Sequence, residues 1–188
     1  MNFAEIFEET MRAMVNNDTV KTHELAEIQN KKIAEIHAKK SKDEITLNFD
    51  MDGTIANLYA VPNWLPLLRA EDPTPYLEAK PLVNLSALAR RLNALQKEGY
   101  KLAIISWLSK EPSPTYDKAV TEAKLAWLKR HLPSVHWDRI TIVAHGTPKQ
   151  NYCGNALDVL FDDEEKNRKD WTGRAYDVQN ILEILKNL

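Results

Sequence analysis

The chain has 188 residues and a formal net charge of −2, so it is long enough for one domain with an accessory segment. It has no overall excess of basic residues that would favour binding to nucleic acid or to an anionic membrane surface. The single cysteine, Cys153, excludes an internal disulfide and favours a reducing, cytoplasmic location. The first residues carry Glu5, Glu8 and Glu9 and do not resemble a signal peptide, and no apolar stretch approaches the roughly 20 residues that cross a bilayer.

Residues 1–44 are predicted to form an N-terminal helical arm, because they contain no Gly or Pro and are dense in Glu, Lys and Ala. A turn is expected at 16–19, and the basic cluster at 39–42 is expected to be a solvated helix end. The arm has three open roles: a lid over a functional site, a contact in a homo-oligomer, or packing on the flank of the main domain. Apolar residues mark the two helices: Phe3, Phe7, Met11, Met14 and Val15 in the first, and Leu25, Ile28, Ile33 and Ile36 in the second.

From residue 45 onward, predicted strands alternate with predicted helices. Strands are expected at 45–50, 101–106, 140–144 and 156–161, with a fifth near 175–176. Helices are expected at 85–98, 115–131 and 165–171, with a last helix ending near 185. This alternation predicts an α/β domain at 45–188 with a parallel sheet flanked by helices. On the helix at 115–131, the residues expected to face inward are Ala119, Ala123, Leu125, Trp127 and Leu128.

The segment 55–82 contains five prolines and is predicted to be loop-like. A crossover helix must follow it, so only about 25 residues, 57–82, remain for an insert that could cover a site at the sheet edge.

Two aspartates two residues apart follow the first predicted strand. Alternate strand residues point to one face, so Asp50 and Asp52 should converge beyond the strand's carboxyl end, where parallel sheets bind ligands. Gly53 lets the chain turn away there. Two such carboxylates suit a divalent cation, and a carboxylate can also attack phosphorus. A calcium-binding EF-hand does not fit, because Gly53 comes too early and Val61 occupies the twelfth position; an ordinary turn stays open as an alternative.

Polar groups also follow the other predicted strands. Ser106 ends the second strand, Lys149 lies in the loop after the third, and Asp162 and Asp163 end the fourth. The carboxyl ends of parallel strands share one edge of the sheet, so these side chains are expected at one site. Taken singly, each has an ordinary alternative: a strand-end serine, a surface lysine and a helix cap.

This ordered set resembles the four motifs of the haloacid dehalogenase superfamily of phosphohydrolases, over about residues 45–185. Asp50-Met51-Asp52-Gly53-Thr54 is similar to the first motif and Ser106 to the second. Lys149 is similar to the third motif, and Asp162-Asp163 to the fourth. The resemblance implies a Rossmann-like sheet and a phosphatase activity.

The resemblance also implies a role for each matching residue. Asp50 would be the nucleophile that forms an aspartyl-phosphate, and Asp52 would be the general acid and base. Ser106 and Lys149 would contact the phosphoryl group. The expected cofactor is Mg²⁺. The resemblance further implies that Gly53 and Thr54 contact the phosphate. It also implies that the metal is bound by the carboxylates of Asp50 and Asp162, by the backbone carbonyl of Asp52 and, through water, by Asp163.

The paired aspartates, followed by Glu164-Glu165 and Asn167-Arg168, resemble the deoxyribonucleotidase branch of the superfamily. That branch usually has a larger helical cap, which this chain lacks. Lys166 and Arg168 are expected to be surface charges. Aromatic side chains near the site could stack on a nucleobase or anchor loops: Tyr59, Trp64, Tyr76 and Trp107.

The function predicted from the sequence is a Mg²⁺-dependent phosphatase that acts on small phosphomonoesters, nucleoside monophosphates among them. One alternative is a phosphatase for the 3′ or 5′ ends of polynucleotides, which an open site would suit. The other is a non-catalytic binding or assembly protein that acts through the helical arm.

Overall fold

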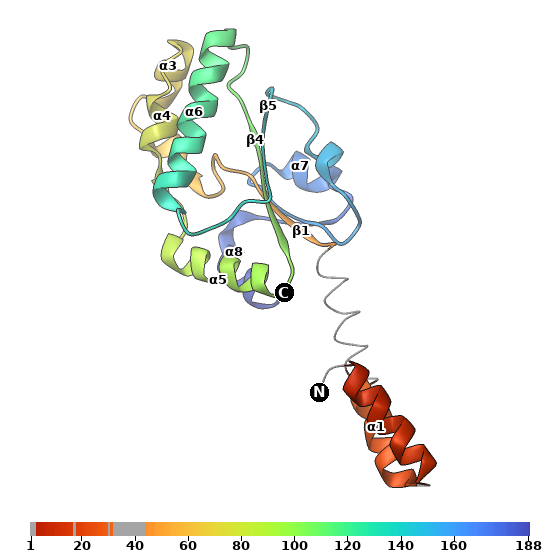
Figure 1. The fold of residues 1–188 in the computed structure, drawn as a ribbon. Coiled ribbons are helices and arrows are strands. Elements are labelled where there is room, and N and C mark those ends of the chain that lie inside the picture. The colour runs from red at the N-terminus through yellow and green to blue at the C-terminus, as the bar shows by residue number, and fades with distance from the viewer. Residues whose placement is uncertain (1–2, 17, 30, 32–43) are drawn as a thin grey trace. The chain divides into compact units, whose positions relative to one another are not determined.

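The computed structural model describes residues 3–16, 18–29, 31 and 44–188 (Figure 1). The chain divides into two compact units, with the boundary between residues 42 and 43. In the first unit, helix α1 (Phe3–Val15) is followed by a second helical stretch at 19–29. The Asp18 carboxylate accepts a hydrogen bond from the Lys21 amide at 3.0 Å and caps this stretch. The expected apolar residues Ile33 and Ile36 and the basic cluster at 39–42 lie outside the described residues.

The second unit contains a five-stranded parallel sheet, which confirms the predicted α/β, Rossmann-like fold. The strand order is β5-β4-β1-β6-β7, so the first strand lies in the middle of the sheet. This places the strands that end at the second and fourth motifs on either side of it. The strands are β1 (Thr46–Phe49), β4 (Lys101–Trp107), β5 (Arg139–Val143), β6 (Val159–Phe161) and β7 (Arg174–Tyr176).

Helices cover both faces of this sheet (Figure 1). Helices α5 (Leu85–Lys97), α6 (Pro114–His131) and α8 (Ile181–Lys186) lie on one face, and α7 (Glu165–Asp170) lies on the other. Successive strand residues alternate between the two faces. Phe49, Ile104 and Phe161 therefore belong to the larger core, while Ile105 and Leu160 pack with Trp171 on the other side.

The ends of the two long helices follow from their sequence. The Asn84 side chain caps α5 by accepting from the Ala87 amide at 3.1 Å, and the chain leaves this helix at Gly99, whose φ is 108°. Ser113 caps α6, and Pro114 occupies the first helical position, where no amide hydrogen is needed. None of the helices in the described part of the chain has both the length and the apolar character needed to span a bilayer.

The expected inward face of α6 is partly wrong. Leu125 is 41% exposed, whereas Lys124, beside it, is 1% exposed. The buried stripe of the helix consists of Tyr116, Val120, Ala123, Lys124, Trp127 and Leu128. Hydrophobicity alone assigned Leu125 to the core, but the helical spacing from Val120 and Trp127 favours position 124.

The insert is ordered, so the prediction of a loop-like segment at 55–82 is wrong for most of it. It contains a two-stranded antiparallel ribbon and three short helices. Pro66 and Pro75 lie in the first turns of two of these helices, where a missing amide hydrogen costs nothing. The elements are β2 (Ala56–Asn57), a 3-10 helix η1 (Leu58–Ala60), α3 (Trp64–Arg69), α4 (Thr74–Glu78) and β3 (Lys80–Pro81).

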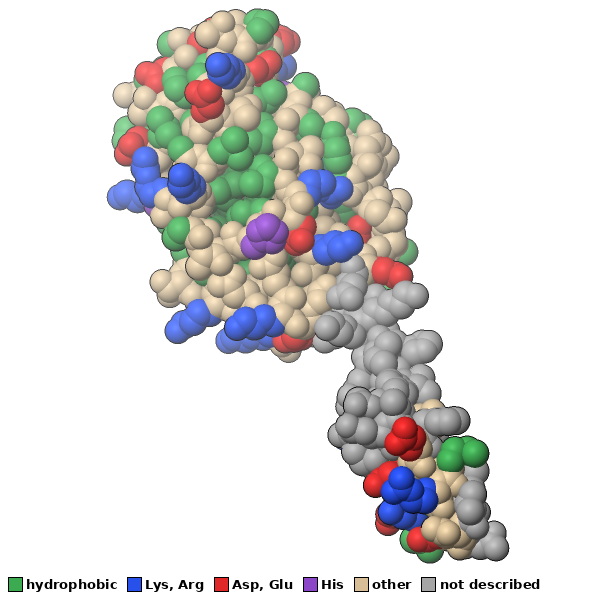
Figure 2. Space-filling view, in the orientation of Figure 1, with side chains coloured by type: hydrophobic (Ala, Val, Ile, Leu, Met, Phe, Trp, Pro, Cys, Tyr) green, Lys and Arg blue, Asp and Glu red, His purple; other side chains and the backbone are tan. Residues whose placement is uncertain are grey.

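Hydrogen bonds and a small apolar cluster hold the insert against α6. The Trp127 indole donates to the Ala79 carbonyl at 2.7 Å, and the Tyr116 hydroxyl donates to the Asp72 carbonyl at 3.0 Å. Figure 2 shows one face of the second unit. Hydrophobic side chains gather in the middle of this face, and charged side chains surround them. The cluster under the insert consists of Leu58, Tyr76, Tyr116, Val120 and Ala123.

Asp158 ties the start of β1 to the turn before β6, which begins three residues later than predicted. The Asp158 carboxylate accepts hydrogen bonds from the Thr46 amide at 2.8 Å and from the Gly154 amide at 2.7 Å. The residue is 1% exposed, so these bonds are shielded from water.

Replacing Asp158 with Ala removes the acceptor of the Thr46 and Gly154 amides and of the Asn155 amide, and we expect a loss of about 2–4 kcal/mol in the free energy of unfolding. Urea unfolding checks this. The exposed Asp170→Ala is the control, and an equal loss in both variants would contradict the assignment.

Candidate active site

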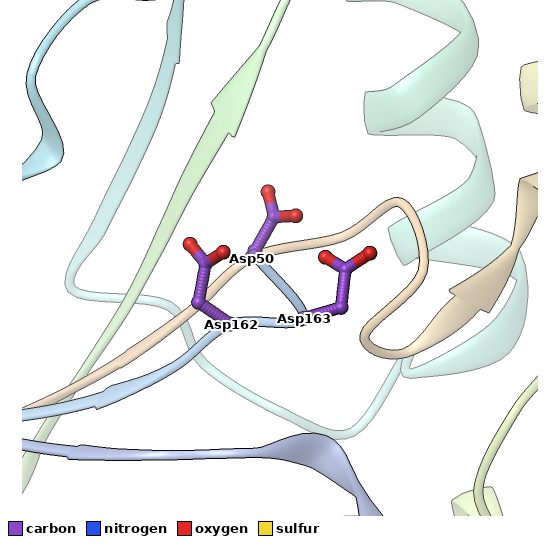
Figure 3. A group of neighbouring side chains, drawn as sticks. All are labelled: Asp50, Asp162 and Asp163. Atoms are coloured by element: carbon purple, nitrogen blue, oxygen red, sulfur yellow. The ribbon is translucent and has the colours of Figure 1, made fainter. Parts of the chain in front are cut away.

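Three carboxylates meet at the carboxyl ends of β1 and β6. Asp50 follows β1, and Asp162 and Asp163 follow β6, the next strand in the sheet. Figure 3 shows the three side chains pointing to the same side. One oxygen from each lies within 4.8 Å of the others. The Asp50 amide donates to the Phe161 carbonyl at 2.9 Å, which extends the strand pairing up to the site and fixes the two strand ends together.

Lys149 lies between two of these carboxylates. Its side chain is 1% exposed, and its Nζ lies 2.9 Å from Asp50 Oδ1 and 2.7 Å from Asp162 Oδ2. Burial alone would lower the pKa of this ammonium, but Asp50 and Asp162 raise it, and the net pKa lies above its ordinary value. The lysine therefore stays charged. The structure thus brings together the predicted first, third and fourth motifs.

Two residues of α7 hold the Asp162-Asp163 pair in place. The Asn167 side-chain amide donates to both carboxylate oxygens of Asp162, at 3.1 and 3.3 Å. Arg168 donates to the backbone carbonyls of Asp162 at 2.8 Å and of Asp163 at 2.7 Å. The expectation that Arg168 is a surface charge is therefore wrong, while Lys166 is exposed as expected. The sequence contained two signals for Asn167, its position one helical turn after the acidic pair and its place in the segment that resembles the deoxyribonucleotidase branch.

The turn after the first motif supports Asp163. Gly53 has a φ of +77°, and a Cβ added to it would lie 2.2 Å from Asp163 Oδ2 and 2.8 Å from the Tyr59 ring. The Gly53 amide donates to the Ala56 carbonyl at 2.8 Å, within the turn. The Thr54 hydroxyl accepts from the Asp163 amide at 3.2 Å. These contacts favour a supporting role for Gly53 and Thr54, and their direct contact with phosphate stays a prediction.

Asp52 has a different partner from the other acids, the buried Lys124 of α6. The same ammonium donates to Ser106 Oγ and to the Trp107 carbonyl, both at 2.8 Å. The structure therefore places the predicted Asp52 and Ser106 around one lysine that sequence reasoning missed. The only available signal was the position of Lys124 in the apolar stripe of its helix, since it matches none of the four motifs.

Crowding changes the proton affinity of the acids. Burial, and then the charge of Asp50, raises the pKa of Asp162 above its ordinary value. The same causes, with Asp162 in addition, raise the pKa of Asp163 to about 7. Burial also raises the pKa of Asp52, although the Lys124 ammonium opposes the shift. A cluster that holds protons in this way lacks enough positive charge for all of its carboxylates.

A cavity of about 600 Å³ opens beside these acids, and Asp50, Asp52 and Asp163 contribute to its lining. Four aromatic residues line it as well. The Trp107 ring lies 4.9 Å from Lys149 Nζ, and the Tyr76 ring lies 4.9 Å from Lys124 Nζ, so each has one face against a site lysine. The other two, Tyr59 and Trp64, come from the insert and pack edge to face with ring centres 5.1 Å apart.

The parallel sheet, with residues of the four predicted motifs near one edge, is consistent with the fold of the haloacid dehalogenase superfamily. The chain matches the family model described as 5′ nucleotidase, deoxy (Pyrimidine), cytosolic type C protein over residues 80–184, which is more than half of its length. The chain therefore belongs to this nucleotidase family, and the predicted resemblance is confirmed. A search of the curated proteins found no match. The matched range contains Ser106, Lys124, Lys149 and Asp162 and begins after the first motif.

The three-carboxylate cluster fits a divalent cation. Carboxylate oxygens are the ligands that Mg²⁺ prefers, and one oxygen from each of Asp50, Asp162 and Asp163 can face a common point. Burial and the neighbouring carboxylates raise the pKa values of Asp162 and Asp163 even though Lys149 is present, so a further cation would favour their charged forms.

Magnesium should stabilise the protein more as the pH rises. Because the folded pKa of Asp163 lies near 7 and above its unfolded value, the metal-free protein loses stability from this group as the pH rises from about 4 to about 7. A cation must displace the proton, so the increase in Tm caused by Mg²⁺ should be small near pH 5 and larger near pH 8. Thermal unfolding with and without Mg²⁺ measures this, with Na⁺ at equal ionic strength as the control. An increase in Tm that does not change with pH would contradict it.

Proposed function

We propose that the protein is a Mg²⁺-dependent phosphatase that hydrolyses phosphomonoesters, nucleoside monophosphates among them, through an aspartyl-phosphate on Asp50. The observation that carries this proposal is the buried Lys149 ammonium, which bridges Asp50 and Asp162 in a cluster of three acids at the sheet edge. Membership in a nucleotidase family supports the same class of reaction.

In the first step, a carboxylate oxygen of Asp50 attacks the phosphorus, and the bond from phosphorus to the leaving oxygen breaks. Lys149 holds Asp50 by its Oδ1 atom and so limits the rotation of the nucleophile. Asp52, which lines the same cavity, gives its proton to the leaving oxygen. Its raised pKa supports this role, because the group must carry a proton before the attack.

In the second step, Asp52 takes a proton from a water molecule that attacks the phosphorus of the aspartyl-phosphate. The acyl phosphate bond breaks, inorganic phosphate leaves, and the Asp50 carboxylate is restored. Ser106 and Lys149 contribute a hydroxyl and an ammonium near the phosphoryl oxygens. A bound Mg²⁺, held by Asp50, Asp162 and Asp163, would offset the repulsion between these acids and the phosphate dianion.

The cavity supports a substrate with a planar ring. Tyr59 is 47% exposed and packs against Trp64 at the cavity wall, so these insert residues offer aromatic surface to a nucleobase. Tyr76 and Trp107 each have one ring face against a lysine, which favours a role in holding the two ammonium groups. The family name, 5′ nucleotidase, deoxy (Pyrimidine), agrees with a nucleotide substrate.

The charges around the cavity favour one nucleotide over the end of a polynucleotide. Only two of the residues that line the cavity, Arg69 and Lys110, are cationic at neutral pH, and they are outnumbered by the carboxylates of the site and of Glu111 and Glu164. Binding of a polynucleotide backbone depends on clustered cations that neutralise several phosphates. The alternative function at polynucleotide ends therefore has less support.

Replacing Asp50 with Asn should reduce the turnover of p-nitrophenyl phosphate by more than about 10³-fold, because the amide cannot form the acyl phosphate. Phosphate release measures turnover, and thermal unfolding verifies that the variant is folded. The exposed Asp170→Asn is the matched control and should keep normal activity. Normal turnover by the Asp50 variant would rule out the nucleophile, and an inactive wild-type protein would favour the non-catalytic alternative.

Replacing Trp64 with Ala should lower kcat/KM for a nucleoside monophosphate by about tenfold, the usual effect of losing one stacking partner. A small alkyl phosphate has no ring and should be hydrolysed with unchanged kcat/KM, which makes it the internal control. Steady-state kinetics on both substrates test this, and an equal fall on both would show that Trp64 only holds the insert. A 5′-phosphorylated oligonucleotide with a higher kcat/KM than the mononucleotide would favour the polynucleotide alternative.

A further inference from the structure

Lys124 occupies a position where a helix normally presents an apolar side chain to the core. It lies on α6 between Val120 and Trp127, which are both fully buried, and its own side chain is 1% exposed. A buried ammonium is tolerated only where opposite charge and hydrogen-bond acceptors surround it. Folding alone would be served by Leu or Met at this position, so the reason for the lysine lies in its partners.

The ammonium of Lys124 has three donor protons, and three acceptors surround it. They are the Asp52 carboxylate, Ser106 Oγ at 2.8 Å and the Trp107 carbonyl at 2.8 Å. The ring of Tyr76, from the insert, lies over the same Nζ at 4.9 Å. With its protons committed in this way, Lys124 takes part in the hydrogen bonding of the site through Asp52 and Ser106.

The contact with Ser106 fixes the direction in which that hydroxyl donates. Because Ser106 Oγ accepts from Lys124, the hydroxyl proton must point away from the ammonium. Within the described part of the chain, the only hydrogen bond of the Ser106 hydroxyl is the one it accepts, so its own proton is not committed to another protein group there. Without the ammonium, the hydroxyl would lose the contact that sets its direction.

We propose that Lys124 is a positioning residue for hydrolysis. Its ammonium sets Ser106 as a donor toward the phosphoryl group and holds the Asp52 carboxyl group in line with the leaving oxygen. This inference rests on the proposed phosphatase function. It adds a second lysine to the site, and the role of this lysine is separate from that of Lys149. The insert takes part because Tyr76 covers the ammonium and α4 is fixed to α6 through the small apolar cluster.

The test compares Lys124→Met with Lys118→Met, an exposed lysine on the same helix whose side chain is 79% exposed. The readout is kcat/KM for two substrates, an alkyl phosphate such as a nucleoside monophosphate and p-nitrophenyl phosphate. The alkyl leaving group depends on proton donation by Asp52, whereas p-nitrophenolate leaves readily without a proton. Thermal unfolding verifies that each variant is folded.

We expect Lys124→Met to lower kcat/KM for the alkyl phosphate by about 10²–10³-fold, and the effect on p-nitrophenyl phosphate should be about tenfold smaller. The Lys118 variant should match the wild type on both. Adding Ser106→Ala to Lys124→Met should cost less than the product of the two single effects, because both act on one hydrogen bond.

A loss smaller than about threefold on the alkyl phosphate, or the same loss on both substrates, would overturn the proposal. Should Lys124→Met fail to fold, Lys124→Gln carries the same test, because its amide keeps two donor protons without the charge. Asp50→Asn, assayed in parallel, separates the two ideas. An inactive Asp50 variant with a normal Lys124 variant would reject the role of Lys124 alone, whereas an active Asp50 variant would reject the phosphatase mechanism.

Discussion

Electrostatic repulsion among three carboxylates is the constraint on which the site depends. One oxygen from each of Asp50, Asp162 and Asp163 lies within 4.8 Å of the others, in a region largely removed from water. Lys149 contacts two of these acids and is itself buried, so neither the acids nor the amine could occupy this place without the other. The strand pairing that joins Asp50 to Phe161 therefore has to position the charges as well as the backbone.

The two buried lysines divide the site into two parts. Lys149 contacts Asp50 and Asp162, which serve the nucleophile and the metal in the proposed reaction. Lys124 contacts Asp52 and Ser106, which serve proton transfer and phosphoryl binding. Each carboxylate interacts most strongly with the cation that it contacts. Separate counter-ions therefore allow neighbouring acids to have different roles in the reaction.

The insert is small, but hydrogen bonds fix it to helix α6. Trp127 and Tyr116 of α6 bond to its backbone, so the cavity wall and the helix that carries Lys124 form one body. A change in the insert that moved Tyr76 would therefore act on the Lys124 ammonium, since the ring lies 4.9 Å from it. Substrate recognition and proton transfer thus share one structural support.

The sequence by itself determined the succession of strands along the chain and the four motifs, because apolar runs that end in Asp, Ser or Asp-Asp are local patterns and the ends of parallel strands share one edge. It could not assign Lys124, Asn167 or Arg168, since a charged or polar residue on a helix is expected to be solvent-exposed until its neighbours in space are known. The fold of the proline-rich insert was also hidden, because its short helices are held by α6 and not by their own propensity. Only the tertiary structure decided which lysine neutralises which acid, since that pairing depends on distances between segments far apart in the chain.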